Sequence, residues 1–266
     1  MFDAVRKMKR TRLDCLPSDI PASIRARYHG APVFDSSCSP EARVYFIDTE
    51  GGLYLKSALG GTLAREAEMT AYFHGMGLAA EVLAYETGDR DFLLTRAVRG
   101  EDLTHSDYLA DPERLCDMHA TVLRELHERD FSGCPVKDRM TEYLALADKN
   151  YRARAFDLSL FPGKFKNADE AYAVLNEGRH LFKNDTLIHG DYCLPNVIYH
   201  DWRFSGFIDL GNSGVGDRHV DIFWGTWTLG YNLKTDKYRD RFLDAYGRDR
   251  IDTDILRVIA AAEVFG

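Results

Sequence analysis

Hydrophobic residues follow different patterns in the two parts of the chain. Up to about residue 100, short apolar runs alternate with turn residues, which is typical of β-strands. Beyond Gly100, apolar residues recur every three or four positions, as in amphipathic helices, and residues 112–129 are the clearest example. The pattern therefore predicts an α+β protein with a small sheet-containing part and a larger, mainly helical part.

A β-hairpin is the clearest element of the first part. Apolar residues at 44–46 and 53–55 flank the sequence Thr-Glu-Gly-Gly at 49–52, which is typical of a tight turn. Two further apolar runs, at 80–85 and 92–97, predict two more strands separated by a turn. We expect these strands to belong to a five-stranded antiparallel sheet.

Helical periodicity predicts one helix within this sheet region and several after it. Residues 63–73 form the first, and Gly77 is expected to end it. Residues 1–30 are also expected to be helical and peripheral. The helices expected in the second part cover residues 112–129, 140–147, 168–182 and 255–265.

The composition is that of an ordinary globular protein. The 266 residues are 45% hydrophobic and 29% charged, which is enough for one large or two modest domains with a core. No apolar run approaches the roughly 20 residues of a membrane span, and the N-terminus lacks the apolar core of a secretory signal. Five cysteines without a Cys-x-x-Cys pair indicate a reduced, cytoplasmic protein.

The charge restricts the partners. A net charge of −8 argues against nucleic acid, because phosphate backbones require basic surfaces. The same charge is compatible with a cationic small molecule, although solubility explains it equally well.

The candidate chemistry is concentrated between residues 187 and 211. His189, Asp191 and Asn196 follow the spacing His-x-Asp-x-x-x-x-Asn, and the apolar run 203–208 leads into Asp209-Leu210-Gly211. In kinase catalytic loops of this spacing, the first aspartate receives the proton of the acceptor hydroxyl, while the asparagine and the second aspartate hold Mg²⁺. Carboxylate and amide oxygens suit Mg²⁺ better than zinc.

Two other interpretations of these residues stay open. His, Asp and Asn are common in polar loops between strands, where they carry no chemistry. The second interpretation is metal-dependent hydrolysis through His189 and Asp191, but no second histidine stands at ligand spacing. The second acid at the end of the next apolar run favours the kinase interpretation.

Three sequences, HGDYCLPN at 189–196, FSGFIDLG at 204–211 and DRHVDI at 217–222, resemble those of the aminoglycoside 3′-phosphotransferases, kanamycin kinases with a protein-kinase-like fold. The resemblance implies an N-terminal nucleotide-binding lobe at 1–96 and a C-terminal catalytic and substrate-binding lobe at 97–266. It also implies transfer of the γ-phosphate of ATP or GTP to a hydroxyl of a small molecule, with two Mg²⁺ ions. We expect a monomer or weak dimer without a nucleic-acid or membrane partner.

Five side chains are expected to carry the reaction. By resemblance, Asp191 is the catalytic base, and Asn196 and Asp209 are the metal ligands. Lys56, at the end of the hairpin's second strand, can reach the α- and β-phosphates provided that a carboxylate holds its side chain. Matching the sequence LAREAEMTAYF to the family assigns that part to Glu66. The alternative is that Lys56 and Glu66 are ordinary solvated charges, one on a strand end and the other on a helix face.

Two backbone segments are expected to contact the nucleotide. The small-residue loop with Ser37, Cys38 and Ser39 stands where a kinase covers the phosphates with N–H groups, and an exposed loop without a ligand is equally compatible. The sequence TRAVRG resembles the hinge between the lobes. There the carbonyl of Ala97 and the amide of Val98 would contact adenine.

Four other polar residues near these motifs are given structural roles. Asp221 is either the acid at the start of an apolar helix or, by kinase resemblance, an acceptor of hydrogen bonds from the catalytic-loop backbone. His119 and His127 lie near the apolar stripe of a helix and are interpreted as core residues. Cys193 is interpreted as a small buried thiol, not as a nucleophile.

Substrate contacts implied by the family come with two departures. The family's insert binds a polycationic antibiotic through acids, whereas here basic residues in 149–170 balance the acidic ones, Asp157 among them. Tyr231 and Asn232 stand where the family often has acids. Glu263 matches the family's terminal glutamate, although this chain adds one residue. The residues implied in substrate binding are therefore Asp157, Tyr231 and Glu263.

Three functions stay open. The close motifs and Glu263 favour an aminoglycoside 3′-kinase that confers antibiotic resistance. The basic insert, with Tyr231 and Asn232, favours a kinase of another hydroxylated metabolite or antibiotic. A nucleotide-binding regulator without turnover is the least supported, because every metal and phosphate residue is present.

Overall fold

The computed structural model describes residues 10–161 and 163–266, and in it the chain forms two compact units. The first unit comprises the chain up to Tyr108 together with Pro195–Gly211, and the second comprises Leu109–Leu194 and Asn212–Gly266. A later segment therefore returns to the first unit. The division of function between residues 1–96 and 97–266 stays a prediction.

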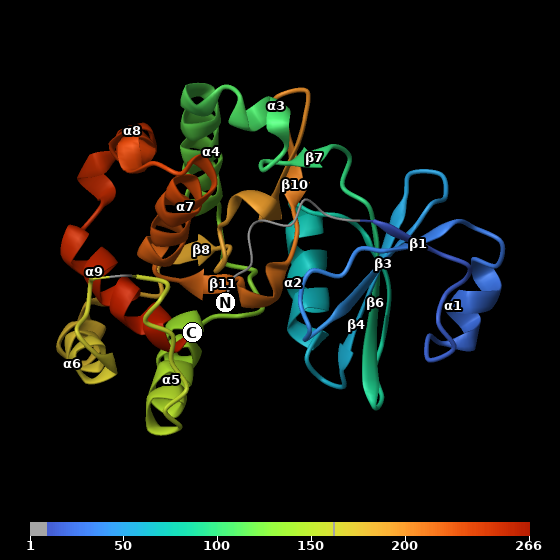
Figure 1. Ribbon diagram of the computed structural model, residues 1–266, viewed down its shortest axis with the longest axis horizontal. Coiled ribbons are helices and arrows are strands. Elements are labelled where there is room, and N and C mark those ends of the chain that lie inside the picture. The colour runs from blue at the N-terminus through green and yellow to red at the C-terminus, as the bar shows by residue number, and fades with distance from the viewer. Residues whose placement is uncertain (1–9, 162) are drawn as a thin grey trace. The chain divides into compact units, whose positions relative to one another are not determined.

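A six-stranded antiparallel sheet forms the body of the first unit, as Figure 1 shows. The strand order is β1-β2-β3-β4-β6-β5, so the predicted hairpin, β3 and β4, lies at its centre. The strands are β1 (Thr11–Leu13), β2 (Val33–Asp35), β3 (Arg43–Ile47), β4 (Leu53–Leu59), β5 (Val82–Glu86) and β6 (Arg90–Arg96).

The prediction of five strands was wrong, and so was the prediction of a helical N-terminal segment over the described residues 10–30. Thr11–Leu13 pairs with Val33–Asp35 as a sixth strand, and only Ala22–Arg27 forms a helix, α1. The reason is tertiary: Leu16, Ile20 and Ile24 pack against the sheet, so apolar spacing near the N-terminus reflects a wrapped segment more than a helical face. Residues 1–9 lie outside the described residues.

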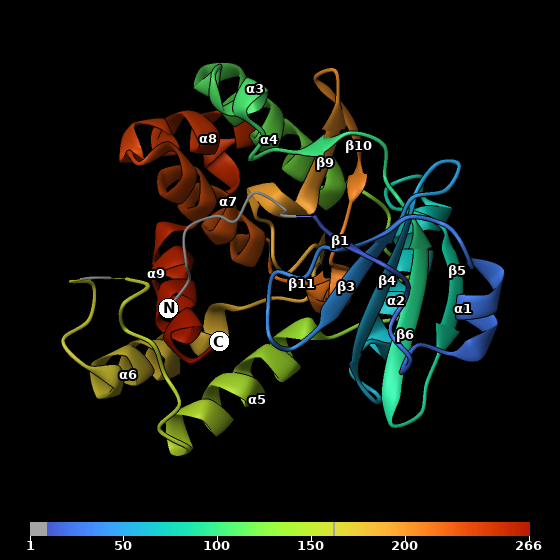
Figure 2. The same cartoon turned by 45° about the vertical axis from the view of Figure 1, so that its right-hand side comes forward.

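Both faces of the sheet are covered by a helix. On one face Ile24 of α1 packs with Leu55 and Leu94, and on the other Ala67 of α2 (Ala64–Gly75) packs with Leu93. Adjacent strand residues point to opposite faces, so the consecutive leucines of β6 serve both cores. Figure 2 shows α1 and α2 on opposite sides of the strands.

The helix α2 ends as predicted. The Met76 N–H donates to the Phe73 carbonyl at 3.1 Å, and Gly77 follows with φ of +73°, the left-handed conformation that glycine adopts at helix ends.

A second, three-stranded sheet completes the first unit. Its order is β10-β9-β7, formed by β7 (Glu101–Asp102), β9 (Val197–His200) and β10 (Arg203–Phe207). The Phe207 N–H donates to the carbonyl of Leu78 at 2.8 Å, and Phe207 packs edge-on against Phe73 of α2. These contacts, each between residues about 130 positions apart, explain why this later segment belongs with the N-terminal sheet.

The second unit is mainly helical, as predicted. A short antiparallel pair, β8 (Thr186–Ile188) with β11 (Gly214–Gly216), lies among its helices. Five of the helices begin at an Asp or Asn whose side chain accepts a hydrogen bond from the first turn, which satisfies a free backbone N–H group. The helices after β7 are α3 (Ser106–Leu109), α4 (Pro112–His127), α5 (Arg139–Arg152), α6 (Ala168–Gly178), α7 (Arg218–Leu233), α8 (Arg239–Tyr246) and α9 (Thr253–Ala262).

Short 3₁₀ turns join or extend these elements. They are η1 (Arg179–Leu181), η2 (Leu194–Asn196), η3 (Leu210–Asn212), η4 (Asp236–Tyr238), η5 (Arg248–Arg250) and η6 (Glu263–Phe265). Across the described ranges, no helix is long and apolar enough to cross a membrane.

Candidate active site

Three of the predicted side chains meet in the first unit. The Lys56 ammonium lies 2.7 Å from Oε2 of Glu66 and 2.9 Å from Oδ1 of Asp209, although the three residues come from β4, α2 and the turn after β10. Lys56 lies in the middle of its strand, not at its end as predicted, because β4 continues to Leu59. The lysine side chain therefore points from a rigid sheet into a gap bounded by two carboxylates.

This geometry keeps the Lys56 side chain protonated and positively charged. Burial alone would lower the pKa of its ammonium, but the carboxylates of Asp209 and Glu66 raise the pKa above its usual value. Burial in turn raises the pKa of Glu66, against the attraction of Lys56. The Asp209 side chain is the open member of the cluster, 51% exposed against 11% for Glu66. It is therefore the carboxylate that a ligand reaches first.

Asp209 has an unusual backbone. Its φ is +59°, in the left-handed region that few side chains other than Asn and Asp adopt. The turn lets the chain leave β10 abruptly and aims the carboxylate at Lys56. Gly211 follows, and a Cβ atom built there lies 3.7 Å from Cβ of Glu66, so α2 passes close to this turn.

Asn196 is positioned beside this turn by the backbone. The Ile208 N–H donates to the carbonyl of Asn196 at 3.0 Å, which places the residue before Asp209 directly against η2. Asn196 is buried. The backbone therefore brings the Asn196 amide and the Asp209 carboxylate to neighbouring positions. Mg²⁺ uses such hard oxygen ligands when substrate phosphates and water complete its coordination. The described residues contain no group of three or more His, Cys, Asp or Glu that could hold a metal without such a substrate.

The loop between β2 and β3 contains Ser37, Cys38 and Ser39, as predicted. Its shape is held by local hydrogen bonds: the Ser37 N–H donates to Asp35 Oδ1 at 2.8 Å, and the Val44 N–H donates to Ser37 Oγ at 2.9 Å. The Ser37 contacts lower the pKa of Asp35. Ser37 thus closes the loop on itself, and its predicted contact with phosphates stays a prediction.

The predicted hinge residues follow β6. The Ala97 N–H donates to the carbonyl of Gly52 at 3.0 Å, which fixes the start of this segment to the hairpin turn. Gly100 has φ of +118°, and a Cβ atom there would meet the Tyr199 carbonyl oxygen at 2.0 Å, so only glycine fits. In the described chain, no backbone–backbone hydrogen bond involves the Ala97 carbonyl or the Val98 amide.

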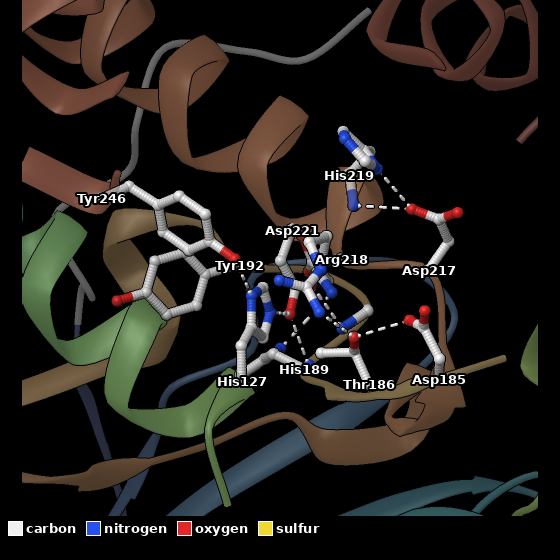
Figure 3. A network of polar contacts seen from close by, with 12 residues as sticks. His127, Asp185, Thr186, His189, Tyr192, Asp217, Arg218, His219, Asp221 and Tyr246 are labelled. Carbon is white, nitrogen blue, oxygen red and sulfur yellow. Dashed lines mark hydrogen bonds and ion pairs between the residues drawn. The ribbon is translucent and has the colours of Figure 1, made fainter. Parts of the chain in front are cut away.

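The catalytic-loop backbone is fixed in the second unit by Asp221, as the kinase resemblance predicted. Asp221 Oδ2 accepts from the His189 N–H and Oδ1 accepts from the Gly190 N–H, both at 2.7 Å (Figure 3). Asp221 is completely buried within α7, whose N-cap is Asp217. Its two bonds define the direction in which the next residue, Asp191, leaves the loop.

Two side chains, those of His127 and Tyr246, support the carboxylate of Asp221. His127 Nε2 lies 3.1 Å from Asp221 Oδ2, and His127 Nδ1 lies 2.8 Å from the Tyr246 hydroxyl (Figure 3). Burial lowers the pKa of His127 despite the nearby carboxylate, so the ring is neutral. A neutral ring must donate from Nε2 to Asp221 and accept the Tyr246 hydroxyl proton at Nδ1. His127 is therefore a buried structural residue, and it also orients the catalytic loop.

His119 is buried as well, stacked on Tyr192 with ring centroids 4.3 Å apart. Burial lowers its pKa to about 3, so this ring is also neutral.

Asp191 lies near two groups that respond to its charge. Burial, together with the nearby Asp191 carboxylate, raises the pKa of Cys193 well above its usual value. The thiol therefore stays protonated, in agreement with its interpretation as a non-nucleophilic residue. Burial also raises the pKa of Glu263 to about 7, and the Asp191 charge contributes to that shift.

Glu263 is held by two residues that the sequence did not indicate. Its Oε1 accepts from the Tyr143 hydroxyl at 2.8 Å and from the Trp224 indole N–H at 3.1 Å. Both donors are neutral, so they compensate only part of the charge. Sequence reasoning missed Tyr143 and Trp224 because they read as ordinary members of the amphipathic helices α5 and α7.

The other two predicted substrate residues have local contacts. Asp157 accepts from the N–H and hydroxyl of Ser159, which lowers its pKa, and its own N–H donates to the Val264 carbonyl. Tyr231 stacks on Trp227 with centroids 4.9 Å apart. All three predicted substrate residues belong to the second unit, as does Asp191.

Salt bridges account for little of the insert's basic charge. Within the described part of 149–170, Arg154 contacts Asp169 at 3.0 Å, and just outside it Arg179 contacts Asp148 at 2.7 Å. The departure from the family that the sequence indicated therefore remains.

An open pocket of about 490 Å³ also lies in the second unit. It contains none of the predicted site residues, so we do not identify it with the active site. Its lining includes Lys183, Asp185, Asp217, Arg218, His219, Asp249, Arg250 and Asp252.

Comparisons with known proteins agree with these features. The Phosphotransferase enzyme family matches residues 39–258. A probable aminoglycoside 3′-phosphotransferase of Lactococcus lactis is 48% identical over 92% of this chain and 95% of its own length.

Solved structures show the same fold. An aminoglycoside-3′-phosphotransferase of type VIII has a TM-score of 0.76 at 22% identity, covering 92% of this chain and 97% of that one. An aminoglycoside phosphotransferase of Streptomyces rimosus in complex with ADP and streptomycin has a TM-score of 0.67 at 22% identity, covering 83% of this chain and 90% of that one.

The fold is that of a kinase-like phosphotransferase, with an antiparallel sheet in one unit and a mainly helical second unit. The chain belongs to the phosphotransferase enzyme family. The predicted α+β fold and the resemblance to aminoglycoside 3′-phosphotransferases are thus confirmed.

Proposed function

We propose that the protein transfers the γ-phosphoryl group of ATP to a hydroxyl group of an aminoglycoside antibiotic and so confers resistance to it. The observation that carries this proposal is the Lys56 ammonium held between Glu66 and Asp209, at 2.7 and 2.9 Å. A lysine braced by a helix carboxylate is the arrangement with which kinases hold the α- and β-phosphates. The 48% identical relative named as a probable aminoglycoside 3′-phosphotransferase supports the acceptor class.

The residues divide the work as follows. Lys56 binds the α- and β-phosphates, and Asn196 and Asp209 would hold Mg²⁺, which neutralises charge on the transferring phosphoryl group when bound. The acceptor oxygen bonds to the γ-phosphorus as the bond to the β–γ bridging oxygen breaks, and ADP leaves. The hydroxyl proton goes to the carboxylate of Asp191.

Asp221 contributes by position alone. It holds the two amides before Asp191, so the base is oriented before the acceptor arrives. Such preorganisation avoids reorganisation at the moment of reaction, which is a principal source of rate in phosphoryl transfer.

Three further points belong to the same proposal. ATP is the proposed donor, supported by the ADP in the Streptomyces rimosus structure. We place the protein in the cytoplasm as a monomer or weak dimer; its five cysteines are all free, which is compatible with a reducing compartment. A kinase of another hydroxylated metabolite is less favoured, because the relatives at 48% and 33% identity are both named as aminoglycoside 3′-phosphotransferases, one of them as probable.

An ADP-release assay tests the proposal. Kanamycin, neomycin, streptomycin, a macrolide and choline would each be supplied with ATP, and separately with GTP. We expect turnover of a kanamycin-type aminoglycoside. Asp191→Asn is expected to lower kcat by about 10³-fold while leaving the Kd for ATP unchanged, since only the proton acceptor is lost.

Equal kcat in Asp191→Asn would remove that residue from the mechanism. Turnover of choline or the macrolide but of no aminoglycoside would contradict the proposed acceptor. Nucleotide binding without product from any acceptor would favour the non-catalytic regulator.

A further inference from the structure

The first unit contains a buried carboxylate, that of Asp91, which the reaction scheme does not use. Asp91 belongs to β6 and is completely buried. It stands two residues before Leu93, which packs against Ala67 of α2. Because alternate residues of a strand point to the same face of a sheet, the Asp91 side chain lies on the face that α2 covers. A carboxylate in such a place is costly unless other groups bind it.

The Asp91 carboxylate binds the start of α2. Its Oδ2 accepts from the Leu63 N–H at 2.8 Å, and its Oδ1 accepts from the Gly61 N–H at 2.9 Å. Leu63 is the N-cap residue of α2, and its own side chain forms no capping hydrogen bond. The first N–H groups of a helix have no partner within the helix and need one from elsewhere. Here a strand residue 28 positions later in the chain supplies it.

Two side chains complete the hydrogen bonds of Asp91. The Tyr85 hydroxyl donates to Oδ2 at 3.0 Å, and the Thr87 side chain also bonds to the carboxylate. Burial alone would raise the pKa of Asp91, but the hydrogen bonds, first those from Gly61 and Leu63, lower it below its usual value. Asp91 is therefore ionised, and a negative charge at the N-terminus of a helix is favourable.

The segment that Asp91 binds connects the two elements that carry Lys56 and Glu66. Residues 60–63 join β4, which carries Lys56, to α2, whose first turn carries Glu66. The segment begins with two glycines, and Gly61 has φ of +85°. Glycine leaves a backbone more freedom than any other residue, so this connection does not by itself fix the start of α2. The two hydrogen bonds to Asp91 do.

We infer that Asp91 is a positioning residue for the nucleotide: by holding the start of α2 against β6, it keeps Glu66 beside the Lys56 ammonium. This inference rests on the proposed function, in which Lys56 binds the α- and β-phosphates, and deepens it. Asp91 pairs in the sheet with Ala58 of β4, two residues beyond Lys56. The strand that carries the lysine and the helix that carries its carboxylate are thus both fixed to one residue, which touches no substrate itself.

Asp91 and Asp221 have the same arrangement in the two units. Each is completely buried, and each accepts hydrogen bonds from two backbone N–H groups close to a site residue. Asp221 orients the loop that carries the base, whereas Asp91 orients the helix that carries the carboxylate beside Lys56. A lysine side chain loses rotational freedom when it binds a ligand, and bracing it in advance lowers that cost. Loss of Asp91 is therefore expected to weaken binding of the nucleotide and not of the acceptor.

Asp91→Asn tests this by calorimetry with ATP and Mg²⁺ in the absence of acceptor. The amide nitrogen of asparagine cannot accept, so one of the two N–H bonds is lost, and we expect the Kd for ATP to rise about tenfold. KM for kanamycin is expected to stay unchanged. Asp91→Ser, whose hydroxyl can still accept one N–H bond, is measured in parallel with the same expectation. The matched control is Tyr85→Phe, which removes a bond to the same carboxylate without touching α2 and is expected to keep Kd within about twofold.

A double substitution separates positioning from general loss of stability. In a Glu66→Gln background, Asp91→Asn is expected to change the Kd for ATP by less than about twofold, because Asp91 acts through Glu66. A purely structural Asp91 would lower the unfolding temperature without changing Kd, or would raise Kd equally in both backgrounds, and either result overturns the inference. The proposed function fails separately, when the unaltered protein phosphorylates no aminoglycoside; the inference alone fails when it does and the Asp91 variants bind ATP like it.

Discussion

Two clusters of acids, one in each unit, handle their charges in opposite ways. In the first unit, the carboxylates of Glu66 and Asp209 share the ammonium of Lys56 at ion-pair distance. In the second unit, Glu263 accepts hydrogen bonds from two neutral donors, Tyr143 and Trp224, and the charge of Asp191 contributes to its raised pKa. The first cluster contains its own counter-charge, whereas the two donors that bind Glu263 carry none.

The difference teaches how one protein treats two substrates of opposite sign. A nucleotide is an anion, so its cluster needs a fixed cation whose position is braced in advance. An aminoglycoside is a cation, so in the proposed function the acids of the second cluster supply the opposite charge. Burial, with a smaller contribution from the charge of Asp191, raises the pKa of Glu263 to about 7.

Asp209→Asn is the strongest way to break the first cluster. It removes one of the two carboxylates beside Lys56 and one proposed ligand of Mg²⁺, so we expect kcat to fall by about 10³-fold. The fold should persist, because asparagine tolerates the left-handed φ of +59° at this position.

Steady-state kinetics and thermal unfolding would check both expectations. A matched substitution of an acid without a role in the cluster, Asp201→Asn, also at positive φ, serves as the control. Retained activity in Asp209→Asn would mean that the first cluster does not act on the nucleotide.

Glu263→Gln breaks the second cluster, and its effect depends on pH. Because the pKa of the folded state, about 7, is higher than the ordinary value of 4.5, Glu263 binds its proton more tightly in the folded protein. Stability from this group is fully present below pH 4.5 and is lost as pH rises to 7. The loss amounts to about 3 kcal/mol.

We therefore expect Glu263→Gln to unfold at a higher temperature than the unaltered protein at pH 8, with a smaller difference at pH 5.5. Thermal unfolding at the two pH values measures this. KM for kanamycin is expected to rise in the same variant, because a predicted acidic contact with the acceptor is lost. A pH-independent difference in unfolding temperature would contradict the raised pKa of Glu263.

His127→Ala tests whether the catalytic loop that carries Asp191 depends on the neutral imidazole behind Asp221. Removing the imidazole leaves Asp221 without one donor and Tyr246 without its acceptor, which we expect to cost about 2 kcal/mol of stability. The looser catalytic loop should lower kcat about tenfold without changing KM for ATP.

His127→Asn is the conservative partner, since its amide can still donate to Asp221. Partial recovery of kcat in that variant would separate orientation of the loop from simple loss of packing. If both variants have unaltered kcat, the support from His127 is structural only.

Local signals in the sequence predicted a good part of the fold. The turn at 49–52, the end of α2 at Gly77 and the helices expected at 112–129, 140–147, 168–182 and 255–265 all follow from short-range patterns. The contacts of Asp221 with the catalytic-loop backbone also agreed with the kinase resemblance. Each of these depends on residues whose roles are fixed by motif or by turn conformation.

Long-range packing was not predictable in the same way. The strand Thr11–Leu13 is only three residues long, and its pairing with Val33–Asp35 depends on a core formed elsewhere. Glu263 could be matched to the family, but its donors Tyr143 and Trp224 come from helices about 120 and 40 residues away, and no spacing rule links them. The sequence likewise gave no indication that the Lys234 ammonium lies over the Tyr231 ring, because the contact depends on how the chain leaves the end of α7.

The left-handed turn at Asp209 has an energetic cost that its ion pair opposes. A non-glycine residue in that conformation costs about 1 kcal/mol, and glycine would relieve it. Glycine would also remove the carboxylate 2.9 Å from the Lys56 ammonium and give the unfolded chain more conformational freedom. In a gene copy no longer exposed to antibiotic, drift to glycine at this codon would therefore remove the carboxylate without making the fold sturdier.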